Sequence, residues 1–581
     1  MINFSRSIIL FSFSLAIGGN ALAQTPPGCE SSVMVQPGDT LSKIASRHYG
    51  DRSDYRRIFD ATNAAAAVDS VYTRIENINR IKPGWTLCLP GSGSASIVVQ
   101  PSIPSQGSRS TVPADTTRIT FLQINDVYEM TPVGGEGGVA RLSTLMQRLE
   151  AKNPNTYSVL SGDMFSPSAL GTAKVDGQRL AGKQMVAAMN AFGLDFATFG
   201  NHEFDIKEDQ FRQRMEETET QWFSSNVFEA DGTSFPNTPQ NLIFSVTHPS
   251  GKDVTVGMFG VTLDSNPVSY VSYTDPFEAA ASHISALKDQ VDILVAVTHL
   301  SMEQDMDLAA QFPDIDLIIG GHEHENAIEW HGPTRTPITK ADANARTAYI
   351  IDMDFNHKTQ QLDIKPRLQR VTSDIPDDPK TAKVVEFWRD KAFEGFESQG
   401  FEPLKNVTTV TDPLDGTEAS VRTQPTLLTK LIAESMLHAA PGTSAAMFNG
   451  GSIRIDDTIL PGPITEYDII RIMPFGGSIE SVEMTGELLM KTLEQGLQNS
   501  GIGGYLQTAG VEKSGNQWVI DGKPVTADGK YNIAINDFLL TGKEQDLEFL
   551  KDDNPGLRKL KSHDDLRKAL IVELKKVYVS N

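Results

Sequence analysis

The sequence has few cysteines, a deficit of basic residues and no long apolar run beyond its first residues. Its 581 residues include 2 cysteines, and 51 Lys and Arg against 74 Asp and Glu give a formal net charge of -23. This deficit argues against wrapping nucleic acid or docking on anionic lipid, because both need basic patches. No later stretch of about twenty apolar residues predicts a transmembrane anchor. An acidic chain can still bind a phosphate ester where metal ions and a few arginines supply positive charge.

The N-terminal segment, residues 1–23, is typical of a secretory signal. Arg6 provides a charged start, Ile8 to Ile17 an apolar centre, and Ala21-Leu22-Ala23 the small-residue cleavage pattern. A membrane anchor is the alternative, but the apolar run is short for a span. We therefore expect a periplasmic or secreted protein.

The length predicts two or three domains, since a single core does not grow to this size. Strands and helices alternate in the central part, which predicts a layered α/β domain, and the last part is mixed α+β with helices expected near residues 425–438 and 563–577. The expected divisions are a small first unit (30–90), a flexible Ser/Pro/Gly-rich linker (91–116), the α/β domain (117–370), a charged linker helix (371–400) and a C-terminal domain (401–581).

The first unit has a recognisable pattern at both ends. It opens with Gln36-Pro37-Gly38-Asp39-Thr40-Leu41 and closes with Ile81-Lys82-Pro83-Gly84, with two helical segments between two strands. This pattern resembles a LysM domain, a small βααβ module. The resemblance implies binding of N-acetylglucosamine-containing glycan, most often peptidoglycan, and thus association with the cell wall. A small folding module without a ligand is the alternative.

The two cysteines, Cys29 and Cys88, bracket this first unit. In a chain bound for an oxidising compartment this placement predicts one disulfide, and a domain this small gains from such a crosslink. Two unpaired thiols are the alternative. Neither cysteine lies near the motifs described next, so neither is expected to bind metal.

Five apolar, strand-like runs in residues 117–370 each end in polar residues that can bind metal. Carboxyl ends of strands gather at one crevice in sheets covered by helices, so these side chains should meet although nearly two hundred positions separate them. Carboxylate, imidazole and amide ligands suit Mn, Zn or Fe. The motifs are Asn125-Asp126-Val127-Tyr128, Ser161-Gly162-Asp163, Gly200-Asn201-His202-Glu203-Phe204-Asp205, Thr298-His299 and Gly320-Gly321-His322-Glu323-His324.

These motifs, in this order, resemble the calcineurin-like metallophosphoesterases and more narrowly the bacterial 5′-nucleotidases. The resemblance implies a layered α/β/β/α fold and two divalent metal ions that generate a hydroxide to attack phosphorus. Asp163 would bridge the metals, and His202, oriented by Asp205, would face the phosphate. The other implied ligands are Asp126 and His324 for the first metal, and Asn201, His299 and His322 for the second.

Tyr128 departs from that family pattern, which usually has histidine at this position. Three alternatives follow: the phenol binds the metal and shifts the preference towards iron, it packs aside while water fills the position, or the first site is weakened. The second alternative is favoured, because Asp126, Asp163 and His324 still supply three ligands.

The last domain resembles the 5′-nucleotidase C-terminal domain through Asn449-Gly450-Gly451-Ser452-Ile453-Arg454, Pro474-Phe475-Gly476-Gly477 and Asn536-Asp537-Phe538. The resemblance implies that Phe475 and Phe538 stack on a nucleobase and that Arg422 and Arg454 bind phosphate, with Asn449 also at the substrate. Core packing is the alternative for each ring. The loop after Phe538 lacks the family's Gly-Gly-Asp-Gly, so a ribose contact by Glu544 or Asp546 stays open.

The expected function is therefore an exported, metal-dependent phosphoester hydrolase that acts on nucleoside 5′-phosphates and is tethered to the cell wall. A 2′,3′-cyclic nucleotide phosphodiesterase, a nucleotide-sugar hydrolase and a non-nucleotide phosphatase are alternatives of the same chemistry. A wall-bound scaffold protein, its metal site decayed through Tyr128, is an alternative of another class.

Overall fold

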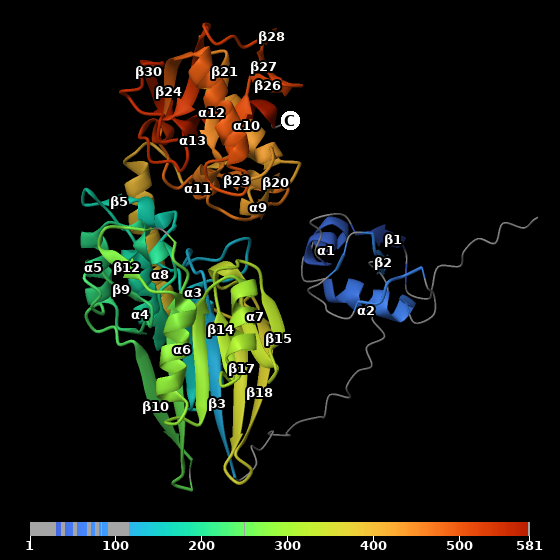
Figure 1. The fold of residues 1–581 in the computed structure, drawn as a ribbon, viewed down its shortest axis with the longest axis vertical. Helices are drawn as coiled ribbons and strands as arrows, with labels where there is room; N and C mark the ends of the chain where they lie inside the picture. Colours follow the sequence, from blue (N-terminus) through green and yellow to red (C-terminus); the bar gives the residue numbers. More distant parts are fainter. Residues whose placement is uncertain are drawn as a thin grey trace, which may run out of the picture. The chain divides into compact units, whose positions relative to one another are not determined.

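The chain forms two compact units, residues 1–111 and residues 112–581 (Figure 1). The computed structural model describes residues 29, 31–35, 41–49, 55–66, 71–75, 81–82, 84–90, 115–248, 250–265 and 267–578. The expected signal segment and nearly all of the expected linker, residues 91–114, lie outside the described residues. In the part of the chain that is described, no helix combines the length and the apolar character needed to cross a membrane.

The first unit has the expected order of strand, two helices and strand. β1 (Ser31–Met34) pairs antiparallel with β2 (Thr86–Leu89), and α1 (Leu41–Tyr49) and α2 (Tyr55–Ala66) lie between them in the sequence. A small core joins these elements through Ile44, Ile58 and Leu87, all fully buried. Cys29 and Cys88 form a disulfide, as predicted.

Two six-stranded sheets make up the first part of the second unit. The first sheet has the order β18 (Gln361–Arg370), β17 (Thr347–Asn356), β3 (Thr116–Ile124), β4 (Thr156–Ser161), β7 (Phe196–Thr198) and β8 (Gln221–Trp222). The second has the order β10 (Asn241–Thr247), β11 (Asp253–Thr262), β13 (Ile293–His299), β14 (Leu317–Gly320), β16 (Thr336–Lys340) and β15 (Ala327–His331). In the first sheet β3, β4, β7 and β8 run parallel, and the pairs that involve β17 are antiparallel. In the second sheet β11, β13, β14 and β16 run parallel, and the edge strands β10 and β15 pair antiparallel.

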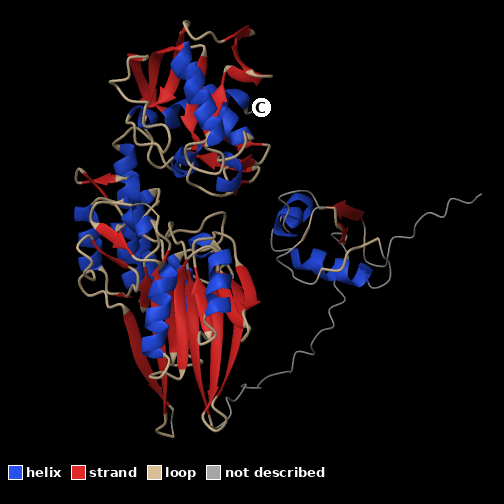
Figure 2. Cartoon of the chain, in the orientation of Figure 1, coloured by secondary structure: helices blue, strands red, loops and turns tan. Residues whose placement is uncertain are grey.

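The sheets pack face to face and helices cover their outer faces. Alternate residues point to opposite faces of a strand, so Phe121 and Val159 enter the core between the sheets while Leu122 and Leu160 face helices. Helices α3 (Val139–Glu150) and α4 (Lys183–Phe192) cover the first sheet, and α6 (Pro276–Leu287) and α7 (Met302–Gln311) cover the second (Figures 1 and 2). The predicted α/β/β/α layering is confirmed.

Helix α8 (Pro379–Glu397) leads to the C-terminal part, as the charged segment predicted. It begins where the Asp378 carboxylate accepts the backbone N–H groups of Lys380 and Thr381, with Pro379 in the first turn. Phe393 and Phe396 on α8 are buried in a core that extends from the first sheet into the C-terminal part.

The C-terminal part is built on a five-stranded sheet with helices on both faces. Met447 and Ile533 face α12 (Gly486–Gln498), whereas Phe448 and Ala534 face α10 (Leu427–Ala439) and α13 (Leu566–Val577). The strand order is β25 (Leu506–Ala509), β21 (Ala445–Asn449), β29 (Lys530–Asn536), β24 (Ser478–Thr485) and β30 (Leu557–Asp565).

Candidate metal centre

The expected site residues stand at the carboxyl ends of five parallel strands. Asp126 follows β3 and Asp163 follows β4, His299 is the last residue of β13, and His322 follows β14. The backbone of Asp126, Asp163 and His322 adopts positive φ angles of 52°, 63° and 81°. Such angles are uncommon outside glycine and gather at functional sites, where surrounding contacts hold the strain. At these three positions the backbone turns sharply where it leaves the strand.

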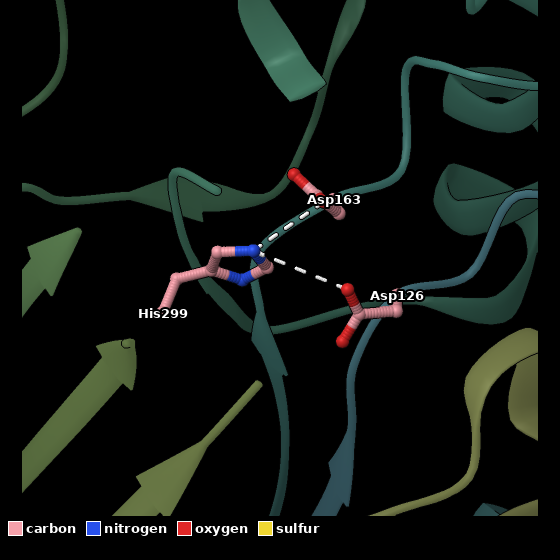
Figure 3. Close-up of side chains that lie close together, drawn as sticks. All are labelled: Asp126, Asp163 and His299. Atoms are coloured by element: carbon pink, nitrogen blue, oxygen red, sulfur yellow. Dashed lines mark ion pairs between the residues drawn. The ribbon is translucent and has the colours of Figure 1, made fainter. Parts of the chain in front are cut away.

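Asp126, Asp163 and His299 form the centre of the site (Figure 3). One ligand atom from each residue lies within 4.8 Å of the others. His299 Nε2 is 3.3 Å from Asp163 Oδ2 and 4.0 Å from Asp126 Oδ1. All three side chains are buried. Two carboxylates and an imidazole at this spacing are a donor set that fits a divalent cation.

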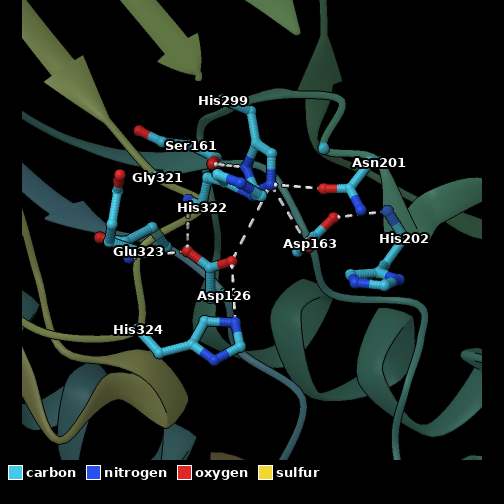
Figure 4. Close-up of polar contacts among 12 residues, drawn as sticks. Asp126, Ser161, Asp163, Asn201, His202, His299, Gly321, His322, Glu323 and His324 are labelled. Carbon is cyan, nitrogen blue, oxygen red and sulfur yellow. Dashed lines mark hydrogen bonds and ion pairs between the residues drawn. The ribbon is translucent and has the colours of Figure 1, made fainter. Parts of the chain in front are cut away.

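The remaining expected ligands surround this centre (Figure 4). Asn201 Oδ1 lies 3.1 Å from His299 Nε2, and His324 Nε2 lies 3.6 Å from Asp126 Oδ1. The His322 and His299 rings are 5.3 Å apart between centroids, and the His322 backbone N–H donates to Asp126 Oδ2. The structure thus brings all six expected metal ligands together.

A hydrogen bond to the protein orients the His299 ring. Its Nδ1 lies 2.8 Å from the Ser161 carbonyl oxygen, which can only accept, so Nδ1 carries the proton. In the neutral ring, which is the form that binds metal, Nε2 then keeps its lone pair and points it towards Asp163 and Asn201. This is the arrangement by which proteins commonly fix the tautomer of a metal-binding histidine.

Burial and mutual charge determine the protonation of the cluster. Burial raises the pKa of Asp126. Burial would also raise the pKa of Asp163, but His299 and His202 outweigh it and hold that pKa below its ordinary value. Burial opposes protonation of His299, yet Asp163 and Asp126 raise its pKa to about 10. The buried negative charge thus calls for a positive partner, a role that a metal ion also fills.

Tyr128 does not pack aside, so the alternative favoured from the sequence is wrong. Its hydroxyl lies 2.9 Å from Asp163 Oδ2, 3.1 Å from Asp126 Oδ1 and 3.1 Å from His324 Nε2. Burial, together with Asp163 and Asp126, raises the pKa of this phenol well above its usual value. The hydroxyl lies among the expected first-metal ligands, because the ring is long enough to reach them from the strand end.

His202 and Asp205 lie beside the cluster in the short helix η3 (His202–Asp205). His202 Nδ1 is 2.7 Å from Asp205 Oδ2, and an Arg454 guanidinium nitrogen lies 3.7 Å from the same oxygen. Burial would lower the pKa of His202, but Asp205 and Asp163 outweigh it and raise the pKa. A pocket lined by Tyr128, His202 and Arg454, among others, opens at this point.

Glu203 has a role that sequence reasoning missed. Its fully buried carboxylate accepts backbone N–H groups from Gly200, Asp163 and Met164 at 2.6–2.9 Å. It therefore ties together the two loops that carry Asp163 and Asn201. Its place inside the Gly-Asn-His-Glu motif was the available signal, but the partners that it binds become adjacent only after folding.

Lys340 also stabilises the loops of the site, and nothing in the sequence predicted this role. This fully buried ammonium group at the end of β16 donates to the carbonyl oxygens of Leu300 and Gly321 at 2.5 and 2.8 Å. It also pairs with Asp305 at 3.0 Å and with Glu323. A buried charge is stable only with such partners, and together they fix the loop that carries His322 and His324.

The aromatic residues expected at the substrate are not core residues. Phe475 and Phe538 are 45% and 40% exposed, far more than the buried rings of this chain. The Arg454 guanidinium carbon lies 6.0 Å from the centre of the Phe475 ring. This places an exposed ring beside the cation that also approaches Asp205.

Arg422 and Asn449, the other residues expected to contact the substrate, form polar contacts with neighbouring residues of the C-terminal part. Arg422 forms an ion pair with Glu418. Asn449 is 3% exposed, and its amide donates to Glu544 Oε2 at 2.6 Å while its carbonyl oxygen accepts from Ser452 and Asn536. Of the two acidic residues left open by the sequence, Glu544 is buried and Asp546 is exposed.

Three segments of the chain match known protein families. Residues 119–326 match the calcineurin-like phosphoesterases, residues 406–552 the 5′-nucleotidase C-terminal domain, and residues 33–62 the LysM domain. The chain therefore combines a calcineurin-like phosphoesterase domain and a 5′-nucleotidase C-terminal domain with a LysM domain. Calcineurin-like phosphoesterases are metal-dependent phosphoester hydrolases, so a chain with this domain is an enzyme of that class.

Curated relatives agree with these domain matches. The chain is 29% identical over 486 residues to the trifunctional nucleotide phosphoesterase protein YfkN of Bacillus subtilis, covering 73% of this chain and 32% of that protein, so it spans about a third of the relative's length. It is 24% identical over 520 residues to the 5′-nucleotidase of Vibrio cholerae, covering 77% of this chain and 90% of the relative.

Solved structures share the fold. The 5′-nucleotidase precursor from Thermus thermophilus superposes with a TM-score of 0.63 at 21% identity, covering 80% of this chain and 97% of that one. A sulfate thiohydrolase, SoxB of Thermus thermophilus, superposes with a TM-score of 0.58 at 15% identity, covering 79% and 94%. The fold is thus shared by proteins named for different reactions.

We predict that Glu203→Gln destabilises the protein and its metal-binding loops. The amide NH2 would face backbone N–H groups that now donate to a carboxylate, leaving buried donors unpaired at a cost of about 1–3 kcal/mol in the free energy of unfolding. Urea unfolding measures the change, with Glu216→Gln on the exposed face of α5 (Glu208–Glu217) as the matched control. Equal stability of the two variants would contradict the role assigned to Glu203.

Proposed function

We propose that the protein is an exported phosphoesterase that uses two divalent metal ions to hydrolyse nucleoside 5′-phosphates and is held at the cell wall by its LysM domain. The observation that supports the hydrolytic part is the convergence of six side chains able to bind metal, from five strand ends, around the buried Asp126, Asp163 and His299. This cluster borders a pocket with His202 and Arg454 on its wall.

The donor set fits two ions with a shared carboxylate. Mn, Zn and Fe all accept this mixture of nitrogen and oxygen ligands. When bound, such a pair polarises the phosphoryl oxygens and lowers the pKa of a water molecule so that it can attack phosphorus near neutral pH. Asp126, Asp163 and His324 would hold one ion, with Tyr128 beside it, and Asp163, Asn201, His299 and His322 would hold the other.

His202 is proposed to act on the phosphate rather than on the metals. Its Nδ1 is engaged by Asp205, so a protonated ring can direct its Nε2–H to a phosphoryl or leaving-group oxygen. Burial opposes protonation of His202, but Asp205 and Asp163 outweigh it and raise the pKa of the ring, which favours the charged form. Arg454, near the same carboxylate, adds a guanidinium fork that matches phosphate oxygens.

The exposed rings of Phe475 and Phe538 supply the surface for the nucleobase. Both rings are exposed, Phe475 lies beside Arg454 on the pocket wall, and a base can stack on an exposed ring face. With a phosphate held near Arg454 and His202, a nucleoside would extend towards Phe475. A nucleoside 5′-phosphate is therefore favoured over a phosphate ester without a base.

We predict metal-dependent release of phosphate from AMP that exceeds release from UDP-glucose, 2′,3′-cyclic AMP and an aryl phosphate. Chelation should abolish the activity and added Mn²⁺ should restore it. Asp163→Ala should lower kcat/KM by roughly a thousandfold or more, because several kcal/mol of charge stabilisation would be lost. Asp253→Asn, on the exposed end of β11, is the control and should leave kcat/KM unchanged.

The substrate panel separates the alternatives. A preference for UDP-glucose or the cyclic nucleotide would replace the nucleotidase proposal with that hydrolase, and a preference for the aryl phosphate would indicate a non-nucleotide phosphatase. If wild type and Asp163→Ala are equally inert after metal is added while glycan binding survives, the scaffold interpretation is correct.

We predict that Phe475→Ala and Phe538→Ala raise the KM for AMP and leave turnover of a base-free phosphate ester unchanged. Stacking of a base on an aromatic ring contributes about 1–3 kcal/mol, so each variant should raise KM roughly 5- to 150-fold. Steady-state kinetics with AMP and glycerol phosphate measure both effects. Phe387→Ala, another exposed ring on α8, is the control. Parallel loss on both substrates would argue against base stacking.

The wall-tethering part of the proposal rests on the LysM match and on the compact first unit. We predict that the full chain sediments with purified peptidoglycan and that chitin oligomers compete for it. A chain of residues 112–581, which form a compact unit of their own, should stay in the supernatant. Equal sedimentation of both chains would show that the LysM domain does not tether the enzyme.

A further inference from the structure

His324, an expected ligand of the first metal, contacts a carboxylate from the C-terminal part of the chain. Its Nδ1 lies 2.5 Å from Oδ2 of Asp456, which is 132 residues away in the sequence. Its Nε2 faces the metal centre, 3.1 Å from the Tyr128 hydroxyl and 3.6 Å from Asp126 Oδ1. The imidazole thus bridges the two parts of the second unit.

The geometry determines what Asp456 does to the ring. A carboxylate can only accept, so the short contact places the proton of a neutral His324 on Nδ1. Nε2 then keeps its lone pair and points it at the Asp126 side of the cluster. His299 obtains the same tautomer from a backbone carbonyl within the phosphoesterase part, whereas His324 obtains it from a side chain of the other part.

Asp456 is itself held rigidly. Its second oxygen, Oδ1, accepts the backbone N–H of Glu418 at 2.6 Å, and its backbone φ is 37°, in the left-handed region. The neighbouring Asp457 pairs with Arg346 at 2.9 Å, and Tyr467 donates to Glu129 at 2.8 Å, so further polar contacts cross the same boundary. The His324 contact therefore belongs to an ordered interface.

We propose that Asp456 is a positioning residue of the metal centre, which holds the His324 imidazole in its metal-binding tautomer from across the domain boundary. This inference rests on the proposed function, since it assumes that His324 binds metal. It adds a functional consequence: affinity for the first metal is linked to the arrangement of the two parts. Separating them removes the partner of His324, and by linkage a bound metal stabilises the joined arrangement.

Asp456→Asn is the sharpest test because it changes one atom and preserves the fold. Asparagine tolerates a left-handed backbone, and its amide oxygen can still accept the Glu418 N–H. The amide NH2 then faces His324 Nδ1 and donates to it, which moves the ring proton to Nε2, where metal should bind. Asp457→Asn is the matched control, because it removes the Arg346 ion pair one residue away without touching His324.

Equilibrium dialysis against Mn²⁺ with metal analysis gives the stoichiometry and affinity directly. We expect two equivalents for wild type and Asp457→Asn. In Asp456→Asn one equivalent should bind about 10- to 100-fold more weakly while the other is unchanged. Excess Mn²⁺ should restore kcat for AMP in Asp456→Asn, a rescue that a misfolded variant would not show, and thermal unfolding of the metal-free proteins checks the fold.

The outcomes separate this inference from the function on which it rests. If wild type binds two equivalents and Asp456→Asn binds both as tightly, the positioning role is wrong while the proposed two-metal site stands. Equal weakening in Asp457→Asn would also overturn it, because the effect would then come from the interface as a whole. A wild-type chain that binds no Mn²⁺ would overturn both proposals.

Discussion

Two carboxylates buried where two sheets meet are the constraint on which the rest of this structure depends. Asp126 and Asp163 lie at the end of adjacent strands of one sheet, with almost no exposure to solvent. Charges removed from water are costly unless they are paired and hydrogen-bonded. The backbone therefore leaves each strand in a strained turn, and N–H groups of His322 and His202 donate to the carboxylates. The cluster of imidazoles supplies the remaining charge compensation.

The supports of this cluster come from both sheets, so its geometry is a property of their packing. Ser161 of the first sheet orients His299 of the second, and Gly321 approaches so closely that a Cβ on it would lie 2.1 Å from the Ser161 carbonyl oxygen. Glu203 ties the Asp163 loop to the Asn201 loop, and Lys340 holds the loop of His322. A shift of either sheet would disturb several donors together.

The fold does not by itself decide the reaction. A similar fold occurs in proteins named 5′-nucleotidase and in one named sulfate thiohydrolase, and function resides in the site that each carries. In this chain the distinguishing features are the phenol of Tyr128 among the expected first-metal ligands and the exposed Phe475 and Phe538 of the C-terminal part. Substitution of these residues would test what determines the metal preference and the substrate preference.

The sequence by itself determined the layered fold and the positions of the main strands and helices. It also indicated that six side chains would lie near one another at the candidate metal centre, because each motif directly follows an apolar run and the carboxyl ends of parallel strands meet. The disulfide between Cys29 and Cys88 could also be predicted from the sequence, since the chain has no other cysteines with which either could pair.

Only the tertiary structure decided the contacts made across loops. Tyr128 was expected to pack aside, and nothing local indicated that its hydroxyl reaches Asp163 and His324. Asp456 lies in a loop without periodicity, 132 residues from the imidazole that it contacts. Hydrophobic periodicity indicates which face of a helix or strand is buried. A polar contact between loops depends instead on the relative positions of whole layers, and the packing of the entire unit determines those positions.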